Sequence, residues 1–171
     1  RFFFPRIQEV FPEQLNGVTE EMYWRYVNRV EPGFIRVEAD EITYGMHIIL
    51  RYELEQEIIA GRVELRDLPR AWNEKMLDYL ALDPRDDAHG VLQDVHWSGG
   101  SFGYFPTYLL GTIASVQIWE KVRSELPDLD SQMEAGEFGP LREWLGEHMY
   151  RWGRRFTPDE MLERIVGGPL D

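Results

Sequence analysis

The apolar residues of this chain recur mostly at helical spacing, and turn-forming residues separate the resulting segments. Thr19, followed by two glutamates, indicates the start of a helix that runs to about Val30, because a hydroxyl caps free N–H groups and acidic side chains favour that helix end. Residues 34–60 contain no proline and a single glycine. They predict one long helix that ends before Gly61.

Further helices are predicted towards the C-terminus. Asp67 and Pro69 indicate the start of a helix that reaches about Leu80. A glycine-rich break at residues 98–103 separates it from the remaining predicted helices, which cover residues 108–126, 129–135, 139–152 and 157–166. No repeat and no convincing strand pair is found, so the sequence predicts an all-α fold and a single helical unit over residues 1–171.

Within residues 34–60, polar side chains recur at steps of three and four and form one stripe: Arg36, Asp40, Thr43 or Tyr44, His47 and Arg51. One interpretation makes the stripe a solvated face, with Arg36 and Asp40 as an ordinary surface pair. The other makes it the lining of an internal cleft, where the planar guanidinium of Arg36 binds a carboxylate. Periodicity favours the first interpretation. The second gains from a separate acidic surface expected further along the helix, formed by Glu53, Glu55 and Glu57.

A second concentration of polar groups in apolar surroundings lies in residues 90–97, GVLQDVHW, beside the glycine-rich break. His96 can donate a hydrogen bond or titrate near neutral pH, and Asp94 can fix its tautomer. Alternatively, His96 is a buried, hydrogen-bonded core residue beside Trp97. The phenols of Tyr104 and Tyr108 follow closely. They are candidates for stabilising an oxyanion, although aromatic residues before an apolar helix are more often core.

Charge and composition exclude several classes of function. The net charge of −13 opposes binding to nucleic acid or to an anionic membrane, which need clustered lysine and arginine. No apolar run is long enough to span a membrane. The absence of cysteine excludes disulfides and thiolate metal sites. None of the four histidines lies four residues from another, so no metal ligands are predicted; a site bridging His89 and His96 is a minor alternative.

Residues 35–40 and 90–97 resemble the IRxxAD and GxxQDxHW signatures of the thermostable, Taq-type zinc carboxypeptidases. The similarity continues, in the order of that family, through residues 28–51, 67–73 and 90–108. The resemblance implies an almost wholly helical, cytoplasmic, commonly homodimeric enzyme with a deep cleft. Such an enzyme removes single residues from peptide C-termini with a water bound to zinc or sometimes cobalt.

The zinc-binding HExxH motif of that family does not occur in these 171 residues. We therefore expect the chain to be the C-terminal part of a larger catalytic domain, without bound metal and inactive until the missing N-terminal part completes it. The alternative is a non-catalytic helical interaction or assembly module that retains the same fold. A chain that packs against a larger partner should also expose an apolar patch.

The resemblance also implies roles for individual side chains. Arg36 would bind the free C-terminal carboxylate of a peptide, with Gln93, Asp94 and Asp40 as further substrate-binding or orienting residues. His96 would lie near the scissile carbonyl, and Tyr104 or Tyr108, with a slight preference for Tyr108, would stabilise the oxyanion. These roles are chemically reasonable, because hydrolysis of the peptide bond builds negative charge on the carbonyl oxygen.

Overall fold

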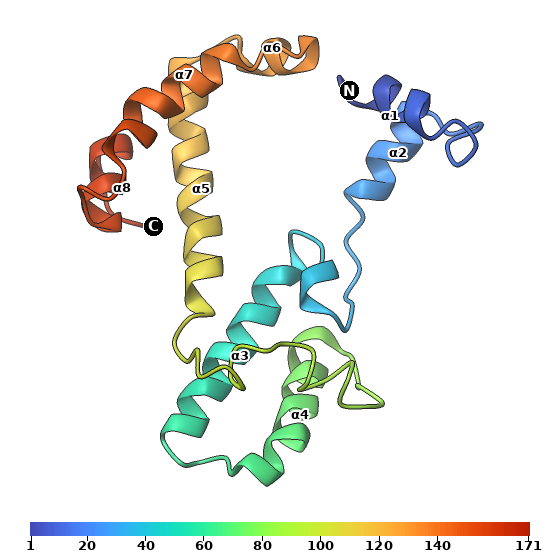
Figure 1. The fold of residues 1–171 in the computed structure, drawn as a ribbon, viewed down its shortest axis with the longest axis vertical. Coiled ribbons are helices and arrows are strands. Elements are labelled where there is room, and N and C mark those ends of the chain that lie inside the picture. Colours follow the sequence, from blue (N-terminus) through green and yellow to red (C-terminus); the bar gives the residue numbers. More distant parts are fainter. The chain divides into compact units, whose positions relative to one another are not determined.

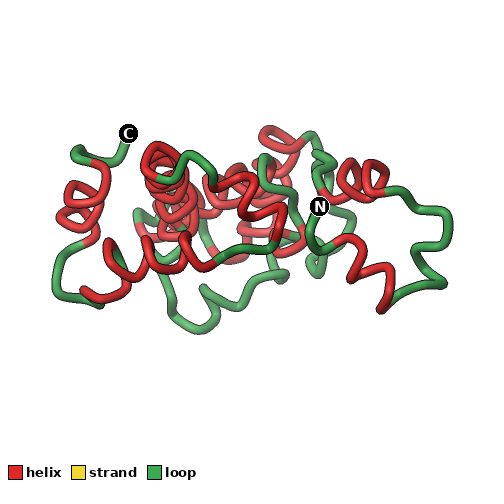
Figure 2. Tube along the Cα trace, turned by 90° about the horizontal axis from the view of Figure 1, so that it is seen from above, coloured by secondary structure: helices red, strands yellow, loops and turns green.

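The protein consists of α-helices joined by loops, without any strand (Figure 2). The computed structural model describes all residues from 1 to 171. In chain order (Figure 1), the α-helices are α1 (Phe4–Val10), α2 (Glu20–Val27), α3 (Thr43–Ile59), α4 (Leu68–Leu80), α5 (Pro106–Glu125), α6 (Leu129–Ala135), α7 (Gly139–His148) and α8 (Pro158–Val166). There are also three short 3-10 helices: η1 (Arg36–Glu38), η2 (Leu65–Asp67) and η3 (Tyr150–Trp152). The predicted all-α fold is confirmed, and no helix is long and apolar enough to cross a membrane.

Two compact units divide the chain. The central unit is Val27–Leu110, and the terminal unit combines Arg1–Tyr26 with Gly111–Asp171. Both sequence motifs and all the candidate site residues lie in the central unit. The candidate site therefore lies wholly within the central unit.

In the central unit, α3 packs against α4 around one hydrophobic core. The buried side chains recur at steps of three and four along each helix, as expected for one helical face: Leu50 and Leu54 on α3, and Leu68, Ala71, Trp72, Met76 and Leu80 on α4. Burial of each large apolar side chain contributes about 1.5–3 kcal/mol. Phe34 and Trp97 pack against this core from the two motif segments, which anchors both segments on the helix pair.

The ends of α3 and α4 follow local signals in the sequence. Helix α3 ends at Ile59, and Gly61 takes the left-handed conformation (φ +67°) that the prediction of a C-terminal glycine requires. Helix α4 covers the predicted residues, with Pro69 in its first turn. Asp67 precedes this helix as predicted, but its side chain makes no capping hydrogen bond, because its backbone is already helical.

The terminal unit has a core of its own, formed by Val122, Leu129, Trp144 and Ile165. The indole Nε1–H of Trp144 donates to the Glu125 carboxylate at 2.7 Å, so the buried ring keeps its polar atom paired. Helix α8 begins with a capping box between Thr157 and Glu160, which agrees with a predicted helix that starts at Thr157.

The prediction of one helix over residues 34–60 is wrong at its N-terminal third. Residues 36–38 form the 3-10 helix η1, Ala39 is extended, and α3 begins only at Thr43. The Asp40 carboxylate accepts hydrogen bonds from the N–H groups of Ile42 and Thr43, which satisfies the free donors at the start of α3. An aspartate whose side chain binds the backbone ahead of it favours a helix start over a helix interior.

Two other predicted helices are shorter in the structure. Helix α2 ends at Val27 instead of Val30. The helix predicted over residues 139–152 divides at Met149 (φ −121°, ψ −65°) into α7 and η3. No proline or glycine marks that division, so the apolar pattern alone did not reveal it.

Candidate functional site

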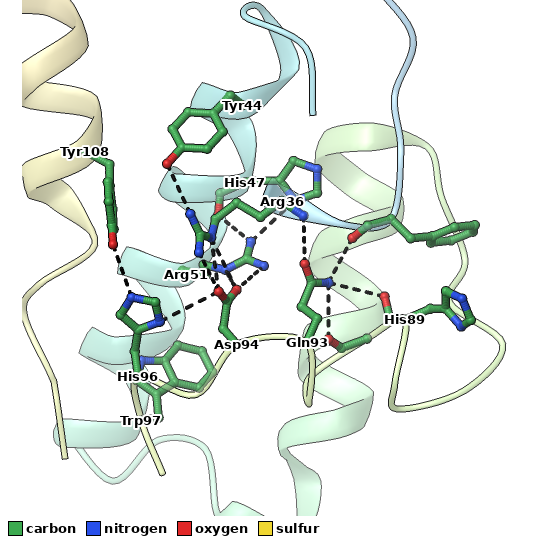
Figure 3. A network of polar contacts seen from close by, with 12 residues as sticks. Arg36, Tyr44, His47, Arg51, His89, Gln93, Asp94, His96, Trp97 and Tyr108 are labelled. Atoms are coloured by element: carbon green, nitrogen blue, oxygen red, sulfur yellow. Dashed lines mark hydrogen bonds and ion pairs between the residues drawn. The ribbon is translucent and has the colours of Figure 1, made fainter. Parts of the chain in front are cut away.

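Arg36, the central residue of the first motif, is buried in the central unit with only 7% of its surface exposed. Its Nε and Nη2 donate to Asp94 Oδ1 at 3.1 and 2.7 Å, and its Nη1 donates to the Tyr44 hydroxyl at 3.1 Å (Figure 3). The interpretation of Arg36 and Asp40 as a solvated surface pair is therefore wrong. Arg36 pairs instead with an aspartate 58 residues away in the other motif.

Asp94 binds a second arginine with its other carboxylate oxygen. Arg51, on α3, is fully buried, and its Nε donates to Asp94 Oδ2 at 2.7 Å. Its Nη1 donates to the backbone carbonyl of His47 at 2.7 Å. We call Arg36, Asp94 and Arg51 the Arg–Asp–Arg cluster. Two guanidinium groups share one carboxylate in it, so the cluster carries an excess positive charge away from bulk water.

Aromatic rings surround the two guanidinium groups. The Arg36 guanidinium carbon lies 5.2 Å from the ring centre of Tyr108 and 5.7 Å from that of Phe105. The corresponding carbon of Arg51 lies 4.5 Å from Trp72 and 5.6 Å from Phe105. Cation–π contacts of this kind stabilise a desolvated arginine without using its N–H groups. The faces of the guanidinium groups are therefore covered while their edges stay available for hydrogen bonds.

The pKa values in this cluster reflect burial and mutual pairing. Burial opposes ionisation of Asp94, but its hydrogen bonds with Arg36 and the nearby charge of Arg51 hold its pKa below the ordinary value. Burial acts against the charge of Arg36 too, yet pairing with Asp94 raises the pKa of Arg36. Burial dominates for Arg51 and lowers its pKa to about 10. All three groups are charged at neutral pH.

Gln93 fixes the backbone that carries Arg36. Its Oε1 accepts the backbone N–H of Arg36 at 2.8 Å, and its Nε2 donates to the carbonyl of Phe34 at 2.8 Å (Figure 3). The same amide also donates to the carbonyls of Gly90 and His89, at 3.2 and 3.3 Å. A single glutamine side chain therefore joins the two motif segments through their backbones.

Asp40 lies apart from the Arg–Asp–Arg cluster in its hydrogen bonding. Besides Ile42 and Thr43, the backbone N–H of Glu31 donates to Asp40 at 2.9 Å, and so does the Thr43 hydroxyl. Partial burial opposes ionisation, but these donors, foremost the Thr43 and Glu31 backbone N–H groups, lower the pKa of Asp40 to about 2. Its observed contacts organise the start of α3, and its role in substrate binding stays a prediction.

His96 is in contact with both candidate tyrosines. Its Nε2 lies 3.3 Å from the Tyr108 hydroxyl (Figure 3). Its ring stacks on Tyr104 with a centroid distance of 5.8 Å and an interplanar angle of 27°. Its Nδ1 is buried without a hydrogen bond, 3.7 Å from Asp94 Oδ1. Asp94 thus faces the His96 ring but lies beyond hydrogen-bonding distance of it.

The two tyrosines differ in their surroundings. Tyr104 is 49% exposed, whereas Tyr108 is half-buried and its ring packs edge-on against Tyr44. Burial, together with neighbouring Tyr104, raises the pKa of Tyr108, so its hydroxyl keeps its proton at neutral pH. Tyr108 can therefore donate a hydrogen bond to a bound oxygen.

Sequence reasoning gave less weight to three residues that the structure makes central. Arg51 and His47 had only completed the polar stripe, yet both are fully buried, and His47 Nε2 lies 3.0 Å from the Gly33 carbonyl. Glu55 had been assigned to an acidic surface. That assignment is wrong, because Glu55 is 3% exposed and accepts hydrogen bonds from Trp97 and Gly103. The four-residue spacing of His47, Arg51 and Glu55 on α3 was the signal that all three share one face.

The central unit offers no ligand set for a metal ion. No group of three or more histidine, cysteine, aspartate or glutamate side chains in the chain is arranged to hold one. His89 binds Asp86 through Nδ1 at 2.9 Å. His47 is engaged with the Gly33 carbonyl. The residues present in this chain therefore do not fit a zinc site.

The comparisons with known proteins agree with the resemblance of the two motifs. Residues 1–171 match the family described as "Carboxypeptidase Taq (M32) metallopeptidase". The chain is 44% identical over 169 residues to "Carboxypeptidase 1" of Bacillus subtilis, covering 99% of this chain and 34% of that protein. It is 47% identical over 165 residues to "Thermostable carboxypeptidase 1" of Thermus thermophilus, covering 96% of this chain and 32% of that protein.

Solved structures show the same similarity in three dimensions. The M32 carboxypeptidase from Deinococcus radiodurans matches with a TM-score of 0.93 and 42% identity, over 99% of this chain and 34% of its own. The Pyrococcus furiosus carboxypeptidase matches with a TM-score of 0.94 and 38% identity, with the same coverage.

The helical fold and these relatives assign the chain to a family of metallopeptidases. More particularly, the chain belongs to the carboxypeptidase Taq family. It spans about a third of the length of the curated relatives that it matches.

Proposed function

We propose that this chain is the C-terminal, substrate-binding part of a zinc- or cobalt-dependent carboxypeptidase that removes single residues from peptide C-termini. On this proposal the chain is inactive alone, and both compact units belong to one larger catalytic domain. The metal would be bound by an N-terminal part of the same enzyme. We also propose that the complete enzyme is a cytoplasmic homodimer, as the family resemblance implies.

The observation that carries the proposal is the excess positive charge of the Arg–Asp–Arg cluster. A buried charge without a partner is costly, so two guanidinium groups that share one carboxylate favour the binding of a further anion. His47, one turn before Arg51 on α3, cannot supply that anion, because a histidine side chain is either neutral or positively charged. Burial and the charge of Arg51 lower the pKa of His47 to about 4, so its ring is neutral at pH 7.

Arg36 is the arginine of the cluster that is placed to reach a ligand. Its side chain is 8% exposed, whereas that of Arg51 is fully covered. A guanidinium carries five N–H donors, and the bonds to Asp94 and Tyr44 leave some of those on Arg36 unused. The free carboxylate of a peptide C-terminus is the planar anion that such a group binds best.

His96, Tyr104 and Tyr108 support the second half of the proposal. A terminal carboxylate held at Arg36 would bring the scissile carbonyl near these rings, since Tyr108 lies against Arg36 and bonds His96. Neutral donors at about 3 Å stabilise the negative charge that develops on a carbonyl oxygen during hydrolysis. Gln93 and Asp94 would fix the position of Arg36 relative to His96, because each of them binds Arg36 from the segment that carries His96.

The first experiment is to sequence the coding DNA upstream of Arg1 in the same frame. The proposal expects an HExxH motif and a nearby third ligand. The complete polypeptide, called here the full-length protein, should then release C-terminal residues from peptides when zinc or cobalt is supplied. Residues 1–171 alone should release none. A full-length protein that contains HExxH, binds metal and leaves peptides intact would overturn the proposal.

A non-catalytic assembly module is the alternative, and one observation favours it. Helix α2 buries none of its residues and exposes more than half of Met22, Trp24, Tyr26 and Val27. An apolar helix surface of this kind is typical of a segment that packs against other protein. The two functions differ in what they require of Arg36, whose loss would impair a peptidase but not a scaffold.

A further inference from the structure

Glu55 is a buried carboxylate in the central unit whose hydrogen-bond donors are both uncharged. Its Oε1 accepts the indole N–H of Trp97 at 2.8 Å, and its Oε2 accepts the backbone N–H of Gly103 at 3.1 Å. The residue is 3% exposed. A buried carboxylate without a cation is costly, and its two donors offset only part of that cost. The role of Glu55 is therefore sought in what its two hydrogen bonds hold together.

The two donors mark the two ends of one turn. The chain leaves the core after Trp97 and re-enters it at Phe105, two residues after Gly103, which is in the left-handed region at φ +74°. Within the turn, Trp97 and Phe102 stack with a centroid distance of 6.4 Å and an interplanar angle of 13°. The carboxylate of Glu55, on helix α3, therefore clamps both ends of a glycine-rich segment that has little regular structure of its own.

The residues just outside the clamp are candidate catalytic residues. His96 precedes Trp97, and Tyr104 follows Gly103. Their rings stack on each other, and His96 also packs against Phe105 with ring centres 4.4 Å apart. The separation of the two clamped points thus sets how His96 faces the tyrosines. Displacement of a reacting group by about 1 Å can lower a rate about 100-fold.

We propose that Glu55 is a positioning residue for the reaction, holding residues 97–103 so that His96 and the tyrosines are aligned with the scissile carbonyl. The proposal rests on the proposed carboxypeptidase function. Glu55 does not touch the Arg–Asp–Arg cluster in any hydrogen bond, so it should act on the chemical step and leave carboxylate binding unchanged.

Glu55→Gln in the full-length protein tests this. An amide has one acceptor oxygen and turns an NH2 group towards the second donor, so one end of the turn is released with little change in volume. We expect kcat to fall about 10- to 100-fold while KM for a peptide with a free C-terminus changes less than about 3-fold. A variant that keeps the wild-type kcat, or that loses activity only through KM, would overturn the proposal.

Trp97→Phe provides the partner substitution, because it removes the indole N–H and keeps an aromatic ring. If Glu55 acts through Trp97, adding Trp97→Phe to Glu55→Gln should lower kcat by less than about 3-fold beyond Glu55→Gln alone. If the decrease in kcat of the double variant equals the product of the decreases in the two single variants, the two residues act independently and the clamp is wrong.

Glu53→Gln is the matched control on the same helix. Glu53 accepts from Lys75 Nζ at 2.7 Å and from the Tyr79 hydroxyl at 2.6 Å, both on α4 and outside the turn. This substitution should lower thermal stability and leave kcat unchanged. A comparable fall of kcat in Glu53→Gln would mean that any loss of a bond on α3 disturbs the reaction, and the specific role of Glu55 would be wrong.

Hydrogen exchange separates failure of this inference from failure of the proposed function. The amides of residues 97–103 should exchange at least about 10-fold faster in Glu55→Gln, with those of residues 34–36 unchanged. A wild-type full-length protein that cleaves no peptide would refute the proposed function, and with it the positioning role in catalysis, whatever the exchange rates. An active wild type with equal exchange in both proteins would refute the clamp alone.

Discussion

Asp94 and Arg51 form an ion pair that is largely shielded from solvent, with Oδ2 of Asp94 2.6 Å from Nη2 of Arg51 and no exposed surface on the Arg51 side chain. Because Asp94 also pairs with Arg36, it is the only negative group between two buried cations. Loss of one partner from a buried pair is far more costly than loss of a surface pair, since it leaves an uncompensated charge.

Asp94→Asn should therefore destabilise the full-length protein strongly. The substitution keeps the size of the side chain but leaves Arg36 and Arg51 facing each other, and we expect a loss of about 3–5 kcal/mol in the free energy of unfolding. Urea unfolding monitored by tryptophan fluorescence measures it. Glu74→Gln, which breaks the exposed pair with Arg70, is the control and should barely move the midpoint. Equal losses in the two variants would mean that the cluster is not buried.

His47 predicts how stability depends on pH. Burial lowers the pKa of His47 to about 4 from an ordinary 6.5. Between pH 4 and 6.5, His47 is therefore protonated in the unfolded state but not in the folded state. The stability of the folded state that depends on a neutral His47 is fully present above pH 6.5 and is lost as the pH falls to about 4. The free energy of unfolding should decrease by about 3 kcal/mol over this range, at 1.36 kcal/mol per pKa unit. Thermal unfolding between pH 7.5 and 4.5 should show this decline.

His47→Gln is the variant that isolates this effect. An amide can still donate to the Gly33 carbonyl but does not titrate, so the decline between pH 6.5 and 4 should become shallower. Parallel profiles for the two proteins would show that His47 is protonated equally in both states. Below pH 4, Asp40 and Asp94 should both contribute to the remaining acid sensitivity, because each has a lowered pKa and is therefore protonated in the unfolded state before the folded state.

The capping box of α8 gives a prediction for the terminal unit. Thr157 accepts the backbone N–H of Glu160 at 3.3 Å, and the Glu160 carboxylate accepts the N–H of Thr157 at 2.8 Å. Thr157→Ala removes the hydroxyl and should cost about 1 kcal/mol in stability, whereas Thr157→Ser should change little. Thermal unfolding of both variants is the measurement. A serine variant as unstable as the alanine variant would show that packing of the methyl group, and not the cap, matters.

Local signals in the sequence were sufficient for most helices. Proline in the first turn of α4, Gly61 after α3 and the Thr157 box before α8 each act within one turn of the chain, so their effect can be predicted without knowledge of the fold. The predicted helix that began too early, at residue 34 instead of Thr43, also has a local cause. Asp40, three residues before Thr43, was counted as part of a stripe although it has the side chain of a helix start.

The candidate site could be predicted only in its composition. Arg36, Gln93, Asp94 and His96 were singled out because polar groups in apolar segments need partners, and three of these four do bind one another. Which residue pairs with which was not predictable, since residues 36 and 94 meet through the packing of both segments on α3 and α4. The burial of Arg51 and Glu55 depends on the same packing, and a charged residue on a helix otherwise indicates an exposed face.

The strongest test of function is Arg36→Met in the full-length protein. Methionine keeps much of the length of the side chain but removes the fork that would hold a substrate carboxylate. For peptides with a free C-terminus, kcat/KM should fall about 30- to 5000-fold, which corresponds to a loss of about 2–5 kcal/mol in transition-state stabilisation. Peptides with an amidated C-terminus should be poor substrates of the wild type, and their kcat/KM should fall little further in the variant. They have no carboxylate to pair with the positive charge of Arg36.

Two further variants decide what a loss of activity means. Arg36→Lys retains a cation without the planar fork, so it should restore only part of kcat/KM. Arg70→Met removes an exposed arginine of α4 and should leave kcat/KM unchanged. The Arg36→Met protein could be less stable and still cleave peptides with free and with amidated C-termini in the same ratio as the wild type. Arg36 would then be a structural residue, and the substrate carboxylate would bind elsewhere. If no variant, nor the wild type, cleaves any peptide with metal bound, the assembly module is the better account of this fold.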